Sequence, residues 1–223
     1  MAVALLVAAG RGERLGSGRP KALVCLSGRP LVQWSVETLQ AVPSVQRIAV
    51  ALPPNVELAS MGDSVIQVPG GSTRSHSVRE ALAAVGPGDP VIVHDAARPL
   101  APVGLFERAL TALEVGRLDA VVAAVPVTDT IKELADDRST VKRTLDRGRL
   151  WAVQTPQVFR REVLERELSC CSDEVLSQAT DDAWLIERAG GSVGLVQADP
   201  GNIKITTELD LRLAEMLLAD RGS

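Results

Sequence analysis

Two positively charged residues, Arg14 and Lys21, lie in or beside a glycine-rich segment near the start of the chain. An apolar run from Val3 to Val7 precedes this segment and predicts a strand that is buried on both faces. The segment itself contains Gly10, Gly12, Gly16 and Gly18. Glycine lets a backbone turn sharply and bring its N–H groups close to an anion. The combination therefore predicts a phosphate-binding loop at the end of a buried strand.

The spacing of these glycines argues against two common phosphate-binding loops. A Rossmann fingerprint needs a glycine where Leu15 stands, and a P-loop needs a Gly-Lys pair that the chain lacks. The remaining pattern, A-A-G-x-G-x-R-x-G followed by Pro-Lys, resembles the first motif of sugar-phosphate nucleotidyltransferases. The alternative interpretation is a surface loop whose charges are simply solvated.

Composition limits the classes of partner. The chain has 223 residues and a net charge of −4, which fits one sizeable domain and argues against a nucleic-acid-binding surface. Its cysteines are odd in number and form no Cys-x-x-Cys motif, as is typical of a reducing compartment. The opening apolar run is too short to span a membrane. We therefore expect a cytoplasmic protein without a membrane or nucleic-acid partner.

Two further polar motifs follow predicted strands. The strand at 64–68 leads into Pro69-Gly-Gly-Ser72, and the strand at 91–93 leads into His94-Asp-Ala-Ala-Arg-Pro99. Strands and helices alternate to about residue 127, which predicts a mainly parallel sheet with helices on both faces. Ligands of such sheets bind beyond the carboxyl ends of the strands. The three loops after residues 7, 68 and 93 should therefore share one crevice.

The segment at 128–150 differs from the rest of the chain. It is rich in charged residues, and two short β segments joined by a turn at 136–139 predict an arm that projects from the sheet. An isolated hairpin is marginally stable, so such an arm needs a partner surface; a solvated excursion is the alternative. Near the end of the chain, Thr207 should cap a last helix whose predicted apolar face contains Leu209, Leu213, Met216 and Leu217.

Four separated motifs occur in a specific order along the chain. They are A-A-G-R-G-E-R-L-G with Pro20-Lys21, G-G-S-T-R-x-x-S at 70–77, H-D-A-A-R-P at 94–99 and N-I-K-I-T at 202–206. With D-T at 129–130, D-R at 146–147 and T-P-Q at 155–157, this set resembles the 2-C-methyl-D-erythritol 4-phosphate cytidylyltransferase family over nearly the full length. The resemblance implies an α/β fold: one Rossmann-like nucleotidyltransferase domain over residues 1–223, with a mainly parallel, mixed central sheet and a projecting β-arm for dimerisation.

The resemblance also implies the reaction. The family transfers a cytidylyl group from CTP to 2-C-methyl-D-erythritol 4-phosphate and releases pyrophosphate, a step of the non-mevalonate isoprenoid pathway that uses Mg²⁺ or another divalent cation. Because the attacking group is already an anionic phosphate, no general base is needed. The obstacle is repulsion between anions, which fixed cations and N–H donors relieve.

Site residues follow from the same resemblance. Arg14 and Lys21 match the pair that stabilises the transition state. Arg147 and Lys204 match two further catalytic residues, and Lys204, like Arg98, matches a residue that positions the acceptor. The residues that match the family's contacts to the nucleotide are Ala8, Ala9, Gly10, Gly70, Gly71, Ser72 and Ser77. The substrate contacts match Asp95, Arg98, Thr130 and Thr155, and Asp95 is also the candidate residue beside the metal. Thr130 and Arg147 lie in the arm and would complete the site of a partner subunit in a homodimer.

Two alternatives remain open at this level. One is a cytidylyltransferase for another polyol phosphate, chiefly ribitol 5-phosphate, which would share the CTP site and differ in the acceptor pocket. The other is a module that binds CTP without turning it over. The sequence also departs from the family pattern at Ala22, where glutamine is frequent, and at Ser72, where an acidic residue is common.

Overall fold

A mixed sheet forms the centre of the protein. The computed structural model describes residues 1–10, 12 and 20–221. Within these residues, a seven-stranded sheet has the spatial order β11 (Val193–Gln197), β7 (Ala120–Pro126), β10 (Trp151–Phe159), β6 (Val91–Asp95), β1 (Ala2–Val7), β4 (Val45–Leu52) and β5 (Val65–Pro69). Strand β10 runs antiparallel to both of its neighbours, and the other pairs are parallel. The predicted fold class is confirmed.

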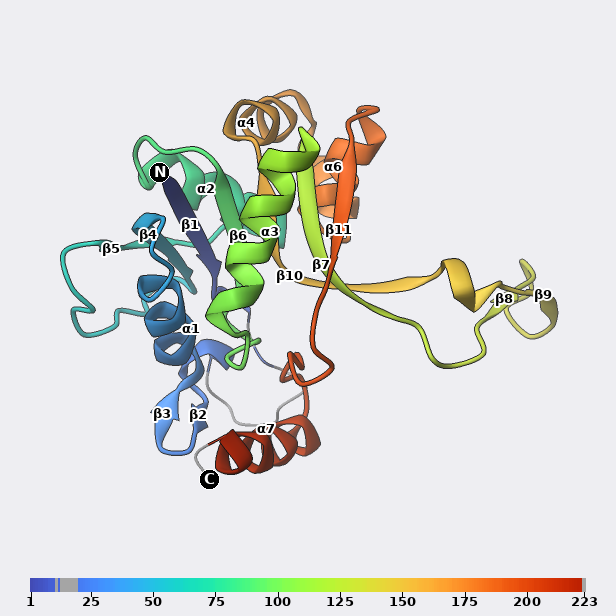
Figure 1. Cartoon of the computed structure of the whole chain (residues 1–223), viewed down its shortest axis with the longest axis horizontal. Coiled ribbons are helices and arrows are strands. Elements are labelled where there is room, and N and C mark those ends of the chain that lie inside the picture. The colour runs from blue at the N-terminus through green and yellow to red at the C-terminus, as the bar shows by residue number, and fades with distance from the viewer. Residues whose placement is uncertain (11, 13–19, 222–223) are drawn as a thin grey trace.

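Helices cover both faces of this sheet (Figure 1). Helices α1 (Leu31–Gln40) and α3 (Val103–Gly116) pack on one face with Ala4 and Leu6 of β1. On the other face, Val3 and Leu5 pack with α2 (Arg74–Ala84), α4 (Arg161–Cys170), α5 (Asp173–Gln178) and α6 (Asp182–Arg188). Successive side chains of a strand point to opposite faces, so an all-apolar strand is stable only where both faces are covered.

The register of the strands gathers the polar loops at one edge. Val7 at the end of β1 is paired with Asp95 at the end of β6 and with Ala51 of β4. In the next pair, Leu52 of β4 is aligned with Pro69 of β5. The carboxyl ends of four parallel strands therefore meet at one edge, and the predicted crevice lies there.

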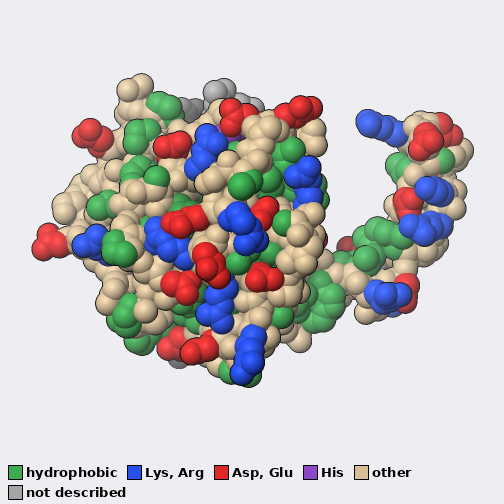
Figure 2. Space-filling model, turned by 90° about the horizontal axis from the view of Figure 1, so that it is seen from above, with side chains coloured by type: hydrophobic (Ala, Val, Ile, Leu, Met, Phe, Trp, Pro, Cys, Tyr) green, Lys and Arg blue, Asp and Glu red, His purple; other side chains and the backbone are tan. Residues whose placement is uncertain are grey.

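The predicted arm projects from the body (Figure 1). It contains the antiparallel strands β8 (Lys132–Leu134) and β9 (Val141–Thr144), followed by the short 3-10 helix η3 (Arg147–Arg149). In Figure 2 the arm stands clear of the body, and hydrophobic side chains gather along the segment that joins it. The large apolar residues that are exposed on the arm and in the first half of β10 are Leu134, Val141, Trp151 and Val153.

The end of the chain packs beneath the sheet edge. Here the 3-10 helix η2 (Lys21–Leu23) and the strands β2 (Cys25–Leu26) and β3 (Arg29–Pro30) lie near α7 (Glu208–Arg221). Thr207 caps α7 as predicted, because its Oγ1 accepts a hydrogen bond of 3.2 Å from the Asp210 N–H. None of the described helices is long and apolar enough to cross a membrane.

The predicted apolar face of α7 was wrong for three of its four residues, and only Leu217 packs inward. Leu209, Leu213 and Met216 are 74, 43 and 66% exposed. The helix instead buries Ala214, beside the partly buried Leu211, Leu217 and Leu218, in a cluster with Leu26, Leu31 and Ile205. Helix α7 carries two apolar stripes, and the neighbours with which it packs determine which one is buried.

Candidate active site

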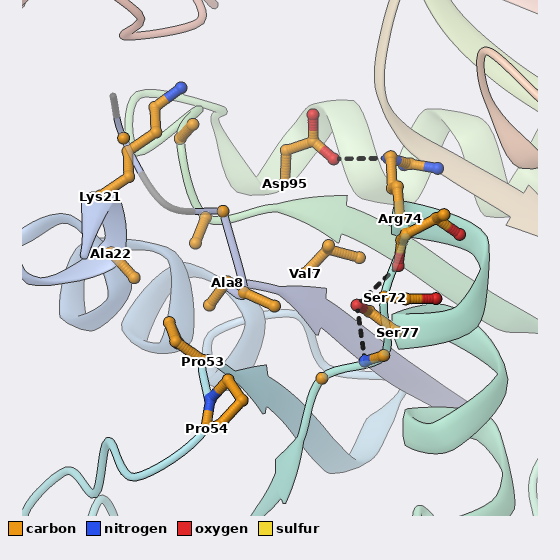
Figure 3. Close-up of a pocket in the computed structure, with 18 of the residues that line it drawn as sticks. Val7, Ala8, Lys21, Ala22, Pro53, Pro54, Ser72, Arg74, Ser77 and Asp95 are labelled. Atoms are coloured by element: carbon orange, nitrogen blue, oxygen red, sulfur yellow. Dashed lines mark hydrogen bonds and ion pairs between the residues drawn. The ribbon is translucent and has the colours of Figure 1, made fainter. Parts of the chain in front are cut away.

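One cavity of about 830 Å³ lies at the carboxyl edge of the sheet (Figure 3). In Figure 3, Lys21, Asp95 and Arg74 lie along its upper rim, and Pro53 and Pro54 border its lower side. Most of the described residues that the sequence assigned to the site line this cavity: Ala8, Ala9, Gly10, Lys21, Gly70, Gly71, Ser72, Ser77, Asp95 and Lys204. Residues from six separate segments thus converge on one space, as the sequence predicted for its three loops.

The two glycine loops touch each other inside the cavity. A Cβ built on Gly70 would lie 2.4 Å from the Cβ of Ala9, so no side chain fits there. The Gly70 N–H donates to the Leu52 carbonyl at 2.7 Å, and the Gly71 N–H donates to Ser77 Oγ at 3.1 Å. Because the two loops touch where Gly70 and Gly71 have no side chains, their backbone groups form the surface that a ligand contacts.

Helix α2 begins at the cavity. Its N-cap is Thr73, whose Oγ1 accepts a hydrogen bond of 3.3 Å from the His76 N–H. Thr73 and Arg74 both line the cavity, so the first turn of α2 faces it. The unpaired N–H groups and the positive dipole end of a helix N-terminus favour a bound anion.

Opposite charges form a chain beside the cavity. Asp95 Oδ2 accepts from Lys204 Nζ at 2.6 Å, and Asp95 Oδ1 accepts from Arg74 Nε at 3.1 Å. Arg74 Nη1 in turn donates to Oδ2 of Asp182, which is fully buried. The chain Lys204–Asp95–Arg74–Asp182 therefore joins the 202–206 segment, β6, α2 and α6.

These linked ion pairs fix the charge state of the site. Burial alone would raise the pKa of Asp95, but Arg74 and Lys204 more than offset that and hold the pKa well below its usual range. Burial also raises the pKa of Asp182, against the opposing effect of Arg74. Burial likewise disfavours a charged Arg74, yet its two carboxylate partners raise its pKa. Asp95 is thus an ionised carboxylate held between two cations.

Sequence reasoning missed part of this arrangement. Neither Arg74 nor Asp182 was among the residues that the sequence assigned to the site. Asp181 caps α6, because its Oδ1 accepts a hydrogen bond of 2.9 Å from the Trp184 N–H. Asp182, the next residue, pairs with Arg74. The available signal was an acidic residue beside a cap residue, and nothing in the sequence indicates that its partner lies 108 positions away.

Arg98 and Thr155 lie behind the cavity and are absent from its lining. Arg98 Nη1 donates to the Asn202 carbonyl at 2.7 Å and so fixes the segment that carries Lys204. Thr155 Oγ1 accepts from the Asp95 N–H at 3.1 Å and lies 2.9 Å from His94 Nδ1. Both residues hold the frame of the site together here, and their substrate contacts stay predictions.

The remaining assigned residues are not in this cavity. Thr130 and Arg147 are exposed on the arm, where Arg147 Nη1 donates to the Thr128 carbonyl at 2.6 Å. Arg14 lies outside the described residues. Of the described residues, Asp95 is the one carboxylate that lines the cavity, and none of them form a group of three His, Cys, Asp or Glu that could hold a metal ion.

The residues present nevertheless fit a cation that is bound mainly by substrate phosphates and waters. Magnesium usually binds one or two carboxylates together with substrate phosphates and waters. Arg74 and Lys204 take one position on each Asp95 oxygen, and a carboxylate offers about four lone-pair sites. Asp95 can therefore serve as one protein anchor for such an ion.

A mainly parallel α/β sheet that presents glycine loops, cationic side chains and an ion-paired carboxylate at its carboxyl edge fits a nucleotidyltransferase. The family model of 2-C-methyl-D-erythritol 4-phosphate cytidylyltransferase matches residues 2–220. The protein of that name from Saccharopolyspora erythraea is 44% identical over 227 residues, which cover 97% of this chain and 99% of the relative. The chain belongs to this family of cytidylyltransferases.

Solved structures agree with the assignment. The enzyme of the same name from Thermus thermophilus has a TM-score of 0.80 and 33% identity, covering 96% of this chain and 98% of its own. The 4-diphosphocytidyl-2C-methyl-D-erythritol synthase from Anaerococcus prevotii has a TM-score of 0.84 and 28% identity, covering 98% of both chains. The predicted family, fold and enzyme class are therefore confirmed.

Proposed function

We propose that the protein transfers the cytidylyl group of CTP to 2-C-methyl-D-erythritol 4-phosphate. The products are 4-diphosphocytidyl-2-C-methyl-D-erythritol and pyrophosphate. The observation that carries this proposal is the cavity in which Lys21, Lys204, Asp95 and the 70–72 loop face one another. It combines cations for two phosphorylated ligands with a close-packed backbone surface for a base.

The nucleotide binds between the two glycine loops in this proposal. Backbone groups of Ala8, Ala9 and Gly10 and of the 70–72 loop read the edge of the pyrimidine, and Ser77 supports the second loop through Gly71. The triphosphate extends toward Lys21. Because glycine and alanine leave the backbone accessible, a flat base approaches it closely.

The acceptor phosphate binds on the side of Lys204 and Asp95. Its anionic oxygen attacks the α-phosphorus of CTP, and pyrophosphate leaves from the opposite side. Lys21 and Arg14 stabilise the negative charge that develops during this displacement, and loss of one such donor typically costs ~10²–10³ in turnover. Asp95 keeps the Lys204 ammonium ordered beside the acceptor through their bond of 2.6 Å.

Mg²⁺ is the divalent cation that we propose for this site. When bound to the triphosphate and anchored at Asp95, it supplies positive charge that reduces repulsion between the two substrates. The protein residues provide the remaining charge, since Lys21, Arg74 and Lys204 all surround the same cavity.

The decisive test is pyrophosphate release from CTP and 2-C-methyl-D-erythritol 4-phosphate with Mg²⁺. We expect turnover by the unaltered protein and a loss of about 10²-fold or more in Lys21→Ala. Arg212→Ala is the matched control, because Arg212 is exposed on α7, where it pairs with Glu208. Full activity of Lys21→Ala would contradict the assigned role. CTP binding without pyrophosphate release would favour the non-catalytic module, and faster turnover of ribitol 5-phosphate would reassign the acceptor.

We further propose that the protein is a homodimer in which each arm completes the site of the partner. Support comes from the exposed apolar residues of the arm and from the position of Thr130 and Arg147 outside their own cavity. The test is to mix the inactive variants Lys21→Ala and Arg147→Ala. In an equimolar mixture about half of the dimers are heterodimers, and one of the two sites in each heterodimer has both an intact Lys21 and an intact arm. About a quarter of the activity should therefore return. No recovery after subunit exchange would refute the shared site.

A further inference from the structure

Asn202 is a completely buried polar residue at the start of the 202–206 segment. Its Nδ2 donates to two oxygens of β10, to Gln154 Oε1 at 2.8 Å and to the Thr155 carbonyl at 3.0 Å. Its own carbonyl accepts from Arg98 Nη1 at 2.7 Å. The segment is therefore attached to β10 through a side chain and to the loop after β6 through its backbone.

Strand β10 can offer these acceptors because it is irregular at this point. Its register with β7 shifts between Val153 and Gln157, and its pairing with β6 starts at Gln157. Among the described strands, neither Gln154 nor Thr155 is aligned with a residue of β6 or β7. Irregularities of this kind re-aim groups beside active sites, and a buried backbone group that leaves a ladder needs another partner. The Asn202 side chain is that partner for the Thr155 carbonyl.

The bonding partners fix the orientation of the Asn202 amide. A backbone carbonyl only accepts hydrogen bonds, so the atom that faces the Thr155 carbonyl is Nδ2. The two Nδ2 hydrogens are then both used, one for each partner on β10. None of the described residues donates to Asn202 Oδ1. The two bonds from Nδ2 therefore carry the whole polar attachment of this side chain.

Lys204 follows this anchor by two residues. On its other side, the Ile205 N–H donates to the Ala97 carbonyl at 2.8 Å, so the backbone is held both before and after Lys204. The Lys204 side chain is 41% exposed, and its Nζ donates to Asp95 at 2.6 Å. A partly exposed ammonium is thus placed at the cavity by buried residues that flank it.

We propose that Asn202 is a positioning residue that anchors its segment to β10 and thereby places the Lys204 ammonium against the acceptor phosphate. Gln154 is its partner in this role. The inference rests on the proposed function, in which the acceptor binds on the side of Lys204. The sequence analysis placed Asn202 in a motif but gave a role only to Lys204, and it gave none to Gln154.

Kinetics and nucleotide binding separate this role from general damage. Asn202→Leu is close to asparagine in shape but has no donor. At saturating CTP we expect its kcat/KM for the acceptor to fall about 10- to 100-fold, because small misplacements of a catalytic group have effects of this size. The Kd of CTP, measured by isothermal titration calorimetry, should change less than about 2-fold, because the nucleotide contacts lie on other loops. Equal losses in both quantities would overturn the proposal.

Two Gln154 variants test the same anchor with a smaller change, and they carry the test if Asn202→Leu does not fold. Gln154→Met removes one acceptor and should lower kcat/KM about 3- to 10-fold, as for the loss of one net hydrogen bond. Gln154→Glu keeps an oxygen that accepts from Nδ2 and should retain most of the activity. Equal losses in these two variants would contradict the role of the bond.

Gln67→Met is the matched control for the loss of a side-chain amide. Gln67 lies on the edge strand β5, where its amide makes hydrogen bonds of 2.8 and 2.9 Å with the backbone of Leu58. This variant should leave both kcat/KM and the Kd of CTP unchanged. A loss as large as that of Gln154→Met would show that any lost amide bond has this effect, and the proposal would fail.

A double variant tests whether Asn202 acts through Lys204. In a Lys204→Ala background, Asn202→Leu should lower kcat/KM for the acceptor less than about 2-fold, because two changes that act through one contact are not additive. A full additive loss would show that the effect of Asn202 bypasses Lys204, which would overturn the proposal.

Hydrogen exchange separates failure of this inference from failure of the proposed reaction. In Asn202→Leu, the Ile205 N–H should exchange about 10-fold faster or more, while the N–H of Leu5 in β1 keeps its rate. Unchanged exchange at Ile205 would overturn the anchor. Faster exchange there, with no pyrophosphate release from CTP by the unaltered protein, would refute the reaction and leave the anchoring of the Lys204 segment standing.

Discussion

Replacing Arg74 with methionine should destabilise the protein through a residue far away in the sequence. Arg74 lies between Asp95 and Asp182, and the Asp182 side chain is 0% exposed. Asp95 would keep its bond to Lys204, but Asp182 has no other cation among the described ion pairs. Arg74→Met therefore leaves a buried carboxylate uncompensated while preserving most of the apolar volume of the side chain.

The size of the effect follows from this burial. Removing one partner of a buried ion pair costs about 3–5 kcal/mol. Burial already raises the pKa of Asp182, so the variant can take up a proton there, and we expect a loss near the lower end, about 3 kcal/mol. That is a large part of a typical free energy of unfolding of about 5–15 kcal/mol.

The double variant Arg74→Met/Asp182→Leu tests the cause directly. It replaces both members of the pair with apolar side chains of similar size, which in buried pairs is often neutral or stabilising. We expect most of the lost free energy of unfolding to return. Pyrophosphate release should stay low in both variants, because Asp95 still lacks the Arg74 bond that orients it at 3.1 Å.

The measurement is urea unfolding at neutral pH, followed by tryptophan fluorescence. Arg79→Met is the matched control, since Arg79 lies on the same helix and is 40% exposed, and its effect should stay within about 0.5 kcal/mol. A loss below about 1 kcal/mol in Arg74→Met would refute the assigned burial cost. A double variant no more stable than the single one would show that Asp182 is not the source of the loss.

Two further predictions concern local structure. Gly71→Ala should raise the Kd of CTP by about 10-fold or more, because the new Cβ would lie 2.8 Å from the His76 backbone carbon. The Kd is measured by calorimetry. Gly104→Ala is the control, because its Cβ would meet only the flexible Arg108 side chain, at 3.7 Å. Hydrogen bonds from Thr206 and Thr207 hold the pKa of Asp210 at about 2, so its contribution to stability is present above about pH 4 and is lost as the pH falls toward 2. Acid unfolding of Asp210→Asn should lack that loss, and an unchanged acid profile would contradict it.

Some features of this protein follow from residues that are close together in the chain. The all-apolar run 3–7 predicts a strand buried on both faces, the glycines that follow it predict a backbone loop, and Thr207 predicts a helix cap. Each depends on local propensity, spacing and short-range hydrogen bonds, so each was predictable. The carboxyl-edge rule for parallel sheets then placed the three loops in one crevice.

Other features depend on the packing of distant segments. Arg74 pairs with Asp182 and His76 with Asp173 only because α5 and α6 pack behind α2. Helix α7 has two apolar stripes, and contact with β2 determines which of them is buried. Periodicity identifies which residues share a face, but burial and the net charge of a site are set by what the neighbouring elements bring to it. Those neighbours exist only in the folded chain.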